Sequence, residues 1–166
     1  MIQIVDNFLS KEECQFLIDA FINNKKHQFG VDDMTYSFTG LNVIESNINY
    51  EHHIPKLKSK YYRNKILRIQ LVNENTNVNE NYHAHRNEVE SVNNNFVIFL
   101  NDNYIGGELE FENKDTIVPK LGTLVKFTAE EPHRVSKVKG NRYTLVGMLD
   151  NKITTGLLVC NPETII

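Results

Sequence analysis

The sequence predicts a mainly β protein in which an N-terminal helical section packs on a double-sheet β core. Short β-rich segments separated by glycine or charged residues recur through the second half of the chain, as they do in all-β sandwiches and barrels. The clearest helical pattern lies near the N-terminus. The 166 residues show no internal repeat and no linker, so we expect one domain that spans 1–166.

The N-terminal section supplies the predicted helices. A short strand is expected at "IQIV", and Ser10 and Glu13 then form the S-x-x-E pattern of a helix capping box. Apolar residues follow at helical spacing, namely Phe16, Leu17, Ala20 and Phe21. These features predict a helix from about Lys11 to Asn23. Residues 25–50 are expected to form loops and one short strand, and "INYEHHIPKLKSKYY" a second helix that is interrupted near Pro55.

The rest of the chain supplies the predicted strands. They are "KILRIQLVNE", "FVIFLND", "GGELEFE", "GTLVKFT", "HRVSKV" and "RYTLVGML", with "GLLVC" as a last candidate. A polar loop, "NTNVNEN", separates the first strand from the second. The glycine pair Gly106 and Gly107 is expected to serve a turn where the backbone is crowded, because glycine tolerates positive φ.

Composition excludes several classes of function. The net charge is -3 and the basic clusters are short, which argues against a dedicated nucleic-acid binder. No apolar run approaches membrane-spanning length, and the first residues do not read as a secretory signal. Cys14 and Cys160 lack a metal or redox spacing, so we expect free thiols in a reducing, cytoplasmic setting. We expect no nucleic-acid or membrane partner, and a monomer or homodimer.

The stretch "NYHAHRNE" carries the first half of a candidate metal site. His83, His85 and Asn87 occupy alternate positions, and alternate side chains of a strand share one face. His133 begins a later predicted strand and offers a further imidazole. Imidazole and oxygen ligands with open positions suit non-haem Fe(II). The other histidines, His27, His52 and His53, are interpreted as structural or exposed.

A candidate anion site follows the distal histidine. Arg142 opens the strand "RYTLVGML", and Thr144 lies on the same face two positions later. A guanidinium fork and a hydroxyl together suit a carboxylate. The alternative for Arg142 is a structural ion pair with one of the glutamates, because a buried unpaired guanidinium is costly.

At these residues the sequence resembles the 2-oxoglutarate and Fe(II)-dependent dioxygenases, specifically the prolyl-4-hydroxylase-like branch. The resemblance rests on "VDNFLSKEECQFLIDAF", "FVIFLNDNYIGGELEFEN" and "PKLGTLVKFTAEEPHRVSKVKGNRYTLVGML", and it covers residues from about 4 to 150. It implies a double-stranded β-helix, or jelly roll, braced by N-terminal helices. It also implies Fe(II) and 2-oxoglutarate as cofactors, with oxidative decarboxylation to succinate coupled to hydroxylation of a C–H bond.

Carried onto this chain, the resemblance makes His133 the distal iron ligand. Arg142 would hold the far carboxylate of 2-oxoglutarate, with Thr144 beside it. The family often places a tyrosine where this chain has Phe99, so either Arg142 and Thr144 suffice for the carboxylate or another hydroxyl, such as that of Tyr82, also binds it. The implied substrate is a protein or peptide side chain, such as proline, or a small molecule. The loop from about 30 to 50 is expected to flank the entrance to the site.

The chain departs from the family at the proximal ligands, where the family has His-x-Asp. In the favoured interpretation His83 and His85 replace that pair, which gives a metal site of His83, His85 and His133. In the alternative, His85 is the histidine and Asn87 replaces the aspartate. Glu88 could supply a carboxylate if the strand bulges there. Three imidazoles would leave the full charge of Fe(II) uncompensated and so favour an anionic chelator.

Two other functions fit the same residues less well. One is a non-catalytic jelly-roll module with a degenerate metal site, and the other is a cupin-like three-histidine dioxygenase that does not use 2-oxoglutarate. The retained "GNRYT" favours the 2-oxoglutarate enzyme over both, since neither alternative needs an arginine there. Composition also resembles the compact, Asn-rich family members found in phages.

Overall fold

A seven-stranded antiparallel sheet forms the frame of the molecule. The computed structural model describes residues 2–32, 37–57, 64–76, 81–84, 92–112 and 115–150. Across the sheet the strands run in the order β1 (Gln3–Val5), β9 (Leu124–Thr128), β5 (Val92–Phe99), β12 (Asn141–Asp150), β4 (Asn64–Asn73), β3 (Ser37–Asn42) and β2 (Phe29–Asp32). Several neighbours in this order, such as β1 and β9 or β12 and β4, are far apart in sequence, so the sheet joins both halves of the chain.

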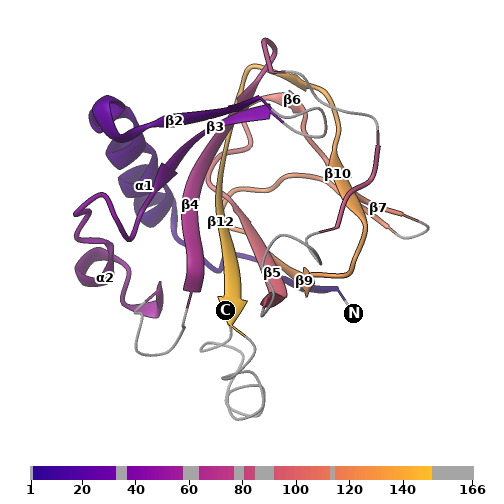
Figure 1. Ribbon diagram of the computed structural model, residues 1–166, viewed down its shortest axis with the longest axis horizontal. Helices are drawn as coiled ribbons and strands as arrows, with labels where there is room; N and C mark the ends of the chain where they lie inside the picture. Colours follow the sequence, from indigo (N-terminus) through magenta and orange to yellow (C-terminus); the bar gives the residue numbers. More distant parts are fainter. Residues whose placement is uncertain are drawn as a thin grey trace.

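A second layer of short strands faces this sheet. It consists of β10 (His133–Val135), β7 (Leu109–Phe111) and β8 (Thr116–Ile117), together with the pair β11 (Val138–Lys139) and β6 (Ile105–Gly106). Figure 1 shows β6, β7 and β10 on one side of the long strands and the helices on the other. The predicted double-sheet core is therefore present.

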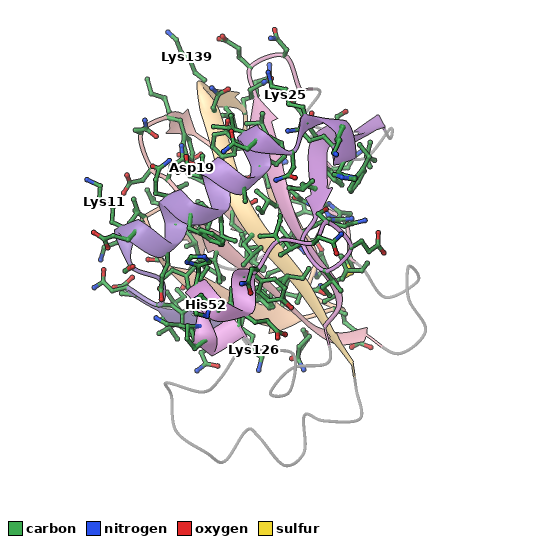
Figure 2. All side chains as sticks on the ribbon, turned by 90° about the vertical axis from the view of Figure 1, so that its left-hand side faces the viewer. Lys11, Asp19, Lys25, His52, Lys126 and Lys139 are labelled. Carbon is green, nitrogen blue, oxygen red and sulfur yellow. The ribbon has the colours of Figure 1, made fainter. Side chains whose placement is uncertain are left out.

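Helix α1 (Lys11–Asn23) has the predicted bounds and the predicted cap. The Ser10 hydroxyl accepts from the Glu13 amide at 3.1 Å, and the Glu13 carboxylate accepts from the Ser10 amide at 2.9 Å. Both bonds satisfy amides that the first turn leaves without helical partners. The buried face of α1 carries Cys14, Leu17, Ile18 and Phe21. Figure 2 shows this helix lying across the strands of the large sheet.

The second predicted helix is shorter than expected. Helix α2 (Tyr50–His53) has a single turn and is followed by the 3-10 turn η2 (Pro55–Leu57). Proline lacks a backbone N–H, so the break falls just before it. A further 3-10 turn, η1 (Lys25–His27), follows α1. No helix in the described ranges has the length and apolar character needed to cross a membrane. The rest of "INYEHHIPKLKSKYY", and "GLLVC", lie outside the described residues.

Strand alternation sorts the apolar residues into two cores. On β5, Phe96 and Ile98 face the helices, whereas Val97 and Phe99 face the small sheets. Large side chains buried in this way each contribute roughly 1.5–3 kcal/mol to folding. The core between the large sheet and the small sheets also contains polar side chains. They are Arg68, Gln70 and Thr144, at inward positions of β4 and β12.

The register of β12 places these polar groups side by side. Thr144 is opposite Gln70 on β4 and opposite Phe99 on β5. Two residues further along β12, Val146 is opposite Arg68 on β4. Since every second residue of a strand faces the same way, this register turns the inner face of the large sheet into one wall of a cavity.

Candidate active site

Two imidazoles meet across an isolated antiparallel bridge. The His83 amide donates to the His133 carbonyl at 2.9 Å, and the His133 amide donates to the His83 carbonyl at the same distance. Directly opposed residues of an antiparallel pair project to one face. The ring centroids accordingly lie 4.5 Å apart. The bridge thus brings together two of the predicted metal ligands, from segments fifty residues apart in sequence.

His133 is held in one orientation. Its side chain is 5% exposed, and its Nδ1 lies 2.8 Å from the carbonyl oxygen of Glu131. A carbonyl oxygen only accepts, so that contact places the proton on Nδ1, and Nε2 is the ring nitrogen that would bind a metal. The ring packs against Phe127, with centroids 4.7 Å apart. A hydrogen bond from the second ring nitrogen to a carbonyl oxygen, like that of Nδ1 to Glu131, is typical of histidines that bind metals.

Arg142 is almost completely buried and forms no ion pair with a described acidic residue. It is 1% exposed, and its Nε donates to the Gly107 carbonyl at 3.0 Å. Its Cζ lies 5.4 Å from the centre of the Phe99 ring. The structural ion pair considered from the sequence is therefore not found in the described part of the chain. A buried guanidinium without a counter-charge is costly, so this site fits an anionic ligand.

Thr144 adds a second unsatisfied group beside this guanidinium. Its side chain is fully buried, and its Oγ1 has no hydrogen-bond partner among the described residues. Arg142 and Thr144 alternate on β12, as predicted, and both line the same cavity as His83 and His133. A carboxylate would satisfy both groups at once.

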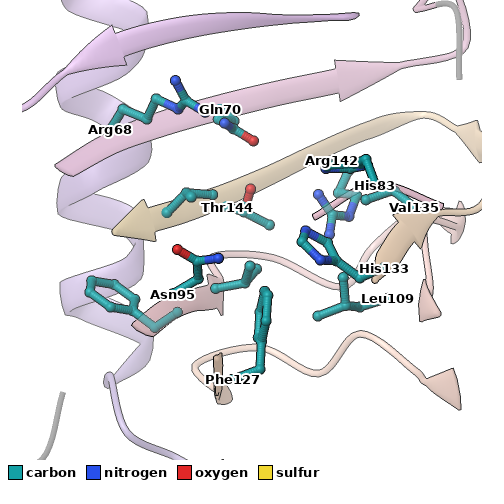
Figure 3. Close-up of a pocket in the computed structure, with 13 residues that line it drawn as sticks. Arg68, Gln70, His83, Asn95, Leu109, Phe127, His133, Val135, Arg142 and Thr144 are labelled. Carbon is teal, nitrogen blue, oxygen red and sulfur yellow. The ribbon is translucent and has the colours of Figure 1, made fainter. Parts of the chain in front are cut away.

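The cavity is open to solvent and offers about 50 Å³ to the centres of water-sized molecules. Figure 3 shows His83, His133 and Arg142 grouped on one side, with Thr144 and Asn95 further along the wall. Its lining includes Arg68, Gln70, His83, Asn95, Val97, Leu109, Phe127, His133, Arg142, Thr144 and Val146. Apolar walls with a few convergent polar groups are typical of small-molecule sites.

Three polar lining residues were not predicted. The side chains of Arg68 and Gln70 form a two-point contact when the amide is oriented with its oxygen toward the guanidinium, at 2.7 Å from Nε and 3.1 Å from Nη2. Asn95 is 1% exposed, and neither polar atom of its side chain has a hydrogen-bond partner among the described residues. In the sequence, polar residues alternating with apolar ones in "RIQLV" and "NFVIF" were the signal that these side chains share the inner face.

The remaining predicted residues lie elsewhere. The ring of Tyr82 lies under Arg134, 4.5 Å from its Cζ, and Arg134 pairs with Glu110. Tyr82 neighbours His83, which lines the cavity, and strand alternation turns the tyrosine the other way. The structure therefore does not bring Tyr82 to Arg142. His85, Asn87 and Glu88 lie outside the described residues. Among the residues described, no three His, Cys, Asp or Glu side chains form a metal-binding group.

The histidines interpreted as structural are indeed remote from the cavity. The ring of His53 stacks on Phe16 with centroids 4.2 Å apart and touches His52 edge-on at 5.3 Å. His27 is exposed in η1. These three lie among the helical elements, on the other side of the large sheet from His83 and His133.

Two facing antiparallel sheets around paired imidazoles and a buried arginine suit a non-haem iron site beside an acidic co-substrate. Comparison with known families gives one match. Residues 69–150 match the profile described as the 2OG-Fe(II) oxygenase superfamily. The match supports a 2-oxoglutarate-dependent dioxygenase, with Fe(II) and 2-oxoglutarate as cofactors. No curated protein sequence matches the chain significantly.

Solved structures confirm the jelly-roll fold. A prolyl-4-hydroxylase from Pseudomonas putida matches with a TM-score of 0.75 at 14% identity, over 91% of this chain and 92% of that one. A prolyl hydroxylase from Trichoplax adhaerens, in complex with a peptide fragment of hypoxia inducible factor, matches with a TM-score of 0.72 at 15% identity, over 96% and 87% of the two chains. The viral collagen prolyl hydroxylase of Paramecium Bursaria Chlorella virus-1, in a 2OG complex, matches with a TM-score of 0.57 at 18% identity, over 90% of this chain and 94% of that one.

The described residues fit the two cofactors of the superfamily. Nε2 of His133 and the ring of His83 offer neutral imidazole ligands, which suit Fe(II). Arg142 and Thr144 offer donors that no described protein group satisfies, apart from the Nε bond to Gly107. These donors match the far carboxylate of 2-oxoglutarate.

Proposed function

We propose that the protein is a hydroxylase that couples oxidative decarboxylation of 2-oxoglutarate to hydroxylation of a C–H bond in a protein or peptide side chain. The observation that carries the proposal is the buried Arg142, which forms no ion pair with a described acidic residue and shares a cavity with His83, His133 and Thr144. The structural neighbours named as prolyl hydroxylases, one of them crystallised with a peptide, support a peptide substrate. A small molecule is the other class of substrate for this cavity.

The proposed iron ligands are His83, His85 and His133. The direct pairing of His83 with His133 supports the interpretation in which His83 occupies the proximal position. His85 lies two positions further along, where continued strand alternation would place it on the same face. With three neutral ligands, the metal keeps its full positive charge. We expect that charge to strengthen binding of a dianionic co-substrate.

The chain's own groups would then divide the work as follows. Arg142 and Thr144 bind the far carboxylate and fix the direction of the co-substrate along β12. The Glu131 carbonyl keeps His133 in the tautomer that binds metal. Apolar residues such as Phe127 and Val146 exclude water from the cavity between them. Iron and 2-oxoglutarate, when bound, supply the oxidising chemistry, and the protein positions the C–H bond.

The test is an anaerobic titration of the purified protein with Fe(II) and then 2-oxoglutarate, followed by visible absorption. We expect a weak charge-transfer band that needs both ligands. Arg142→Ala should keep iron but require far more 2-oxoglutarate for the band, whereas His133→Ala should lose iron by metal analysis. If the wild-type protein shows no band and binds no metal, the protein is instead a non-catalytic jelly-roll module.

A second set of variants tests the ligand assignment. His83→Ala and His85→Ala should each lose iron, and Asn87→Ala should retain it. His85→Asp should retain iron, because it restores the acid that the family places there. If Asn87→Ala loses iron while His83→Ala keeps it, the ligand set is His85, Asn87 and His133.

A further inference from the structure

Tyr104 lies against the buried arginine of the proposed co-substrate site. It follows β5 and precedes the glycine pair at 106 and 107. A Cβ atom built on Gly107 would lie 2.8 Å from Cδ of Arg142 and 2.9 Å from Cε2 of Tyr104. The two side chains therefore converge on one point of the backbone, and only glycine at that point allows them to do so.

The Tyr104 hydroxyl is buried in this contact. Its oxygen is inaccessible to solvent and meets no described group in full hydrogen-bond geometry, yet the Arg142 guanidinium lies close enough to act on its pKa. Burial raises the pKa of Tyr104 to about 12, and the nearby Arg142 guanidinium partly offsets the rise. The phenol is consequently neutral at working pH, with one proton to donate and lone pairs that can accept.

Arg142 needs a second fixed contact if it is to present a fork to a carboxylate. Its Nε is held by the Gly107 carbonyl, but this bond alone leaves the outer nitrogens without a described protein partner. The aromatic ring over which its guanidinium lies, Phe99, has no hydroxyl. Tyr82, the hydroxyl proposed from the sequence, lies under Arg134 instead. Tyr104 is the buried hydroxyl that the structure does place at Arg142.

We propose that Tyr104 is a positioning residue of the co-substrate site, whose hydroxyl accepts from the Arg142 guanidinium and aligns it with the far carboxylate of the 2-oxo acid. The inference rests on the proposed function, because it assumes that Arg142 binds that carboxylate. Gly107 and Tyr104 then hold the guanidinium at two points, so little freedom remains to be lost when the ligand binds.

The test compares two ligands in the anaerobic Fe(II) titration. 2-Oxoglutarate has the far carboxylate, whereas 2-oxovalerate has the same 2-oxo acid end and chain length but no far carboxylate. Tyr104→Phe should raise the Kd for 2-oxoglutarate about ten-fold, as expected for loss of a hydrogen bond to a charged group. The Kd for 2-oxovalerate and the iron content should stay unchanged, which a merely structural role would not predict.

Tyr143→Phe is the matched control, because Tyr143 adjoins Arg142 on β12 but faces α1, where its ring meets Phe21 edge-on. It should leave both Kd values unchanged. The double variant Tyr104→Phe with Phe99→Tyr returns a hydroxyl to the other side of the guanidinium and should recover part of the affinity. Should Tyr104→Phe bind both ligands like the wild type, or weaken both equally, the inference is wrong. Failure of the wild type to bind 2-oxoglutarate would instead overturn the proposed function.

Discussion

Asn95 places a carboxamide in the cavity wall, and within the described part of the chain neither of its polar atoms is hydrogen bonded. The side chain is 1% exposed and lies on the inner face of β5, opposite Phe127 on β9 and Met148 on β12. A buried amide without partners costs about 1–3 kcal/mol relative to one that is hydrogen bonded. Polar groups kept at such a cost are common at functional sites, where stability is exchanged for activity.

Replacing Asn95 with leucine should therefore stabilise the protein. We expect Asn95→Leu to raise the free energy of unfolding by about 1 kcal/mol, because it removes the unsatisfied amide and keeps a similar volume. Urea denaturation of the cofactor-free protein measures the change. Asn95→Asp, which puts a charge at the same buried position, should destabilise it. A loss of stability in the leucine variant would show that the amide has a partner in solution.

At the scale of elements, the glycine pair before β7 shapes the arginine site. Gly106 and Gly107 have φ values of 77° and 72°, and a Cβ atom on Gly106 would lie 1.9 Å from the Lys137 carbonyl oxygen. The prediction that this pair serves a crowded turn is confirmed. The same turn presents the Gly107 carbonyl to Arg142, so backbone geometry and ligand binding are linked here.

Gly107→Ala should consequently impair both stability and co-substrate binding. The new methyl group would lie 2.8 Å from Arg142 at a φ that alanine rarely adopts. We expect a loss of about 1–3 kcal/mol in unfolding free energy and a higher Kd for 2-oxoglutarate. Gly30→Ala on β2 is the matched control, since nothing lies within 4 Å of its Cβ position. An unaltered Kd in the Gly107 variant would separate the turn from the arginine site.

Lys126 is a buried cation on the outer face of the large sheet. It lies on β9, between Gln3 on β1 and Phe96 on β5, and is 7% exposed. Figure 2 labels it at the lower end of the face that carries α1. Burial lowers the pKa of its ammonium group. Between the folded pKa and the ordinary value the unfolded chain binds more protons, so stability rises with pH in that window.

Lys126→Met should stabilise the protein at neutral pH and remove this rise. The gain should be on the order of 1 kcal/mol, because the variant keeps the buried stem and loses the charge. Urea unfolding of both proteins from pH 7 to pH 10.5 measures the difference. We expect the two curves to converge as the pH approaches the ordinary lysine value. A constant difference at all pH values would mean that packing, not charge, is responsible.

The hairpin of β2 and β3 shows where prediction from sequence failed. The sequence predicted one short strand for residues 25–50, yet the structure has two. Gly40 interrupts the β pattern, but Phe29 is opposite it on the neighbouring strand, and the ring fills the space a Cβ would take, at 2.6 Å. That compensation comes from another segment, so single-segment reasoning misses it. The helix at Lys11, by contrast, depends on a local capping box and was predicted correctly.

The candidate site likewise contains residues that could be predicted from the sequence and residues that could not. His133, Arg142 and Thr144 were predicted from the sequence. Arg142 and Thr144 could be grouped because strand spacing alone places them on one face. Tyr104 was not, because its contact with Arg142 depends on a turn at positive φ that no periodic pattern reveals. Residues near in sequence could thus be grouped by alternation, whereas contacts made across a turn required the structure.

At the scale of the whole molecule, Cys14 lies where helix α1 packs on strand β5, which lines the cavity on its other face. It is 1% exposed on the buried face of α1, with its sulfur 4.0 Å from the Phe99 carbonyl oxygen. Phe99 belongs to β5, and its ring faces the inner core beside Arg142. One strand therefore separates the thiol from the proposed co-substrate site. Burial raises the pKa of Cys14 to about 12, so the folded protein offers almost no reactive thiolate.

Alkylation of Cys14 should therefore report the opening of the whole molecule. In a Cys160→Ser variant, iodoacetamide should modify Cys14 slowly in the folded protein and fast in urea, as followed by mass spectrometry. Ligands that bind only the folded state reduce the open population by the factor 1 + [L]/Kd. Mn(II), as a redox-inert substitute for iron, with 2-oxoglutarate at ten times its Kd should slow alkylation about ten-fold. An unchanged rate would mean that α1 opens independently of the cavity. A slowed rate that disappears in Arg142→Ala would show that anion binding at β12 stabilises the distant helix contact.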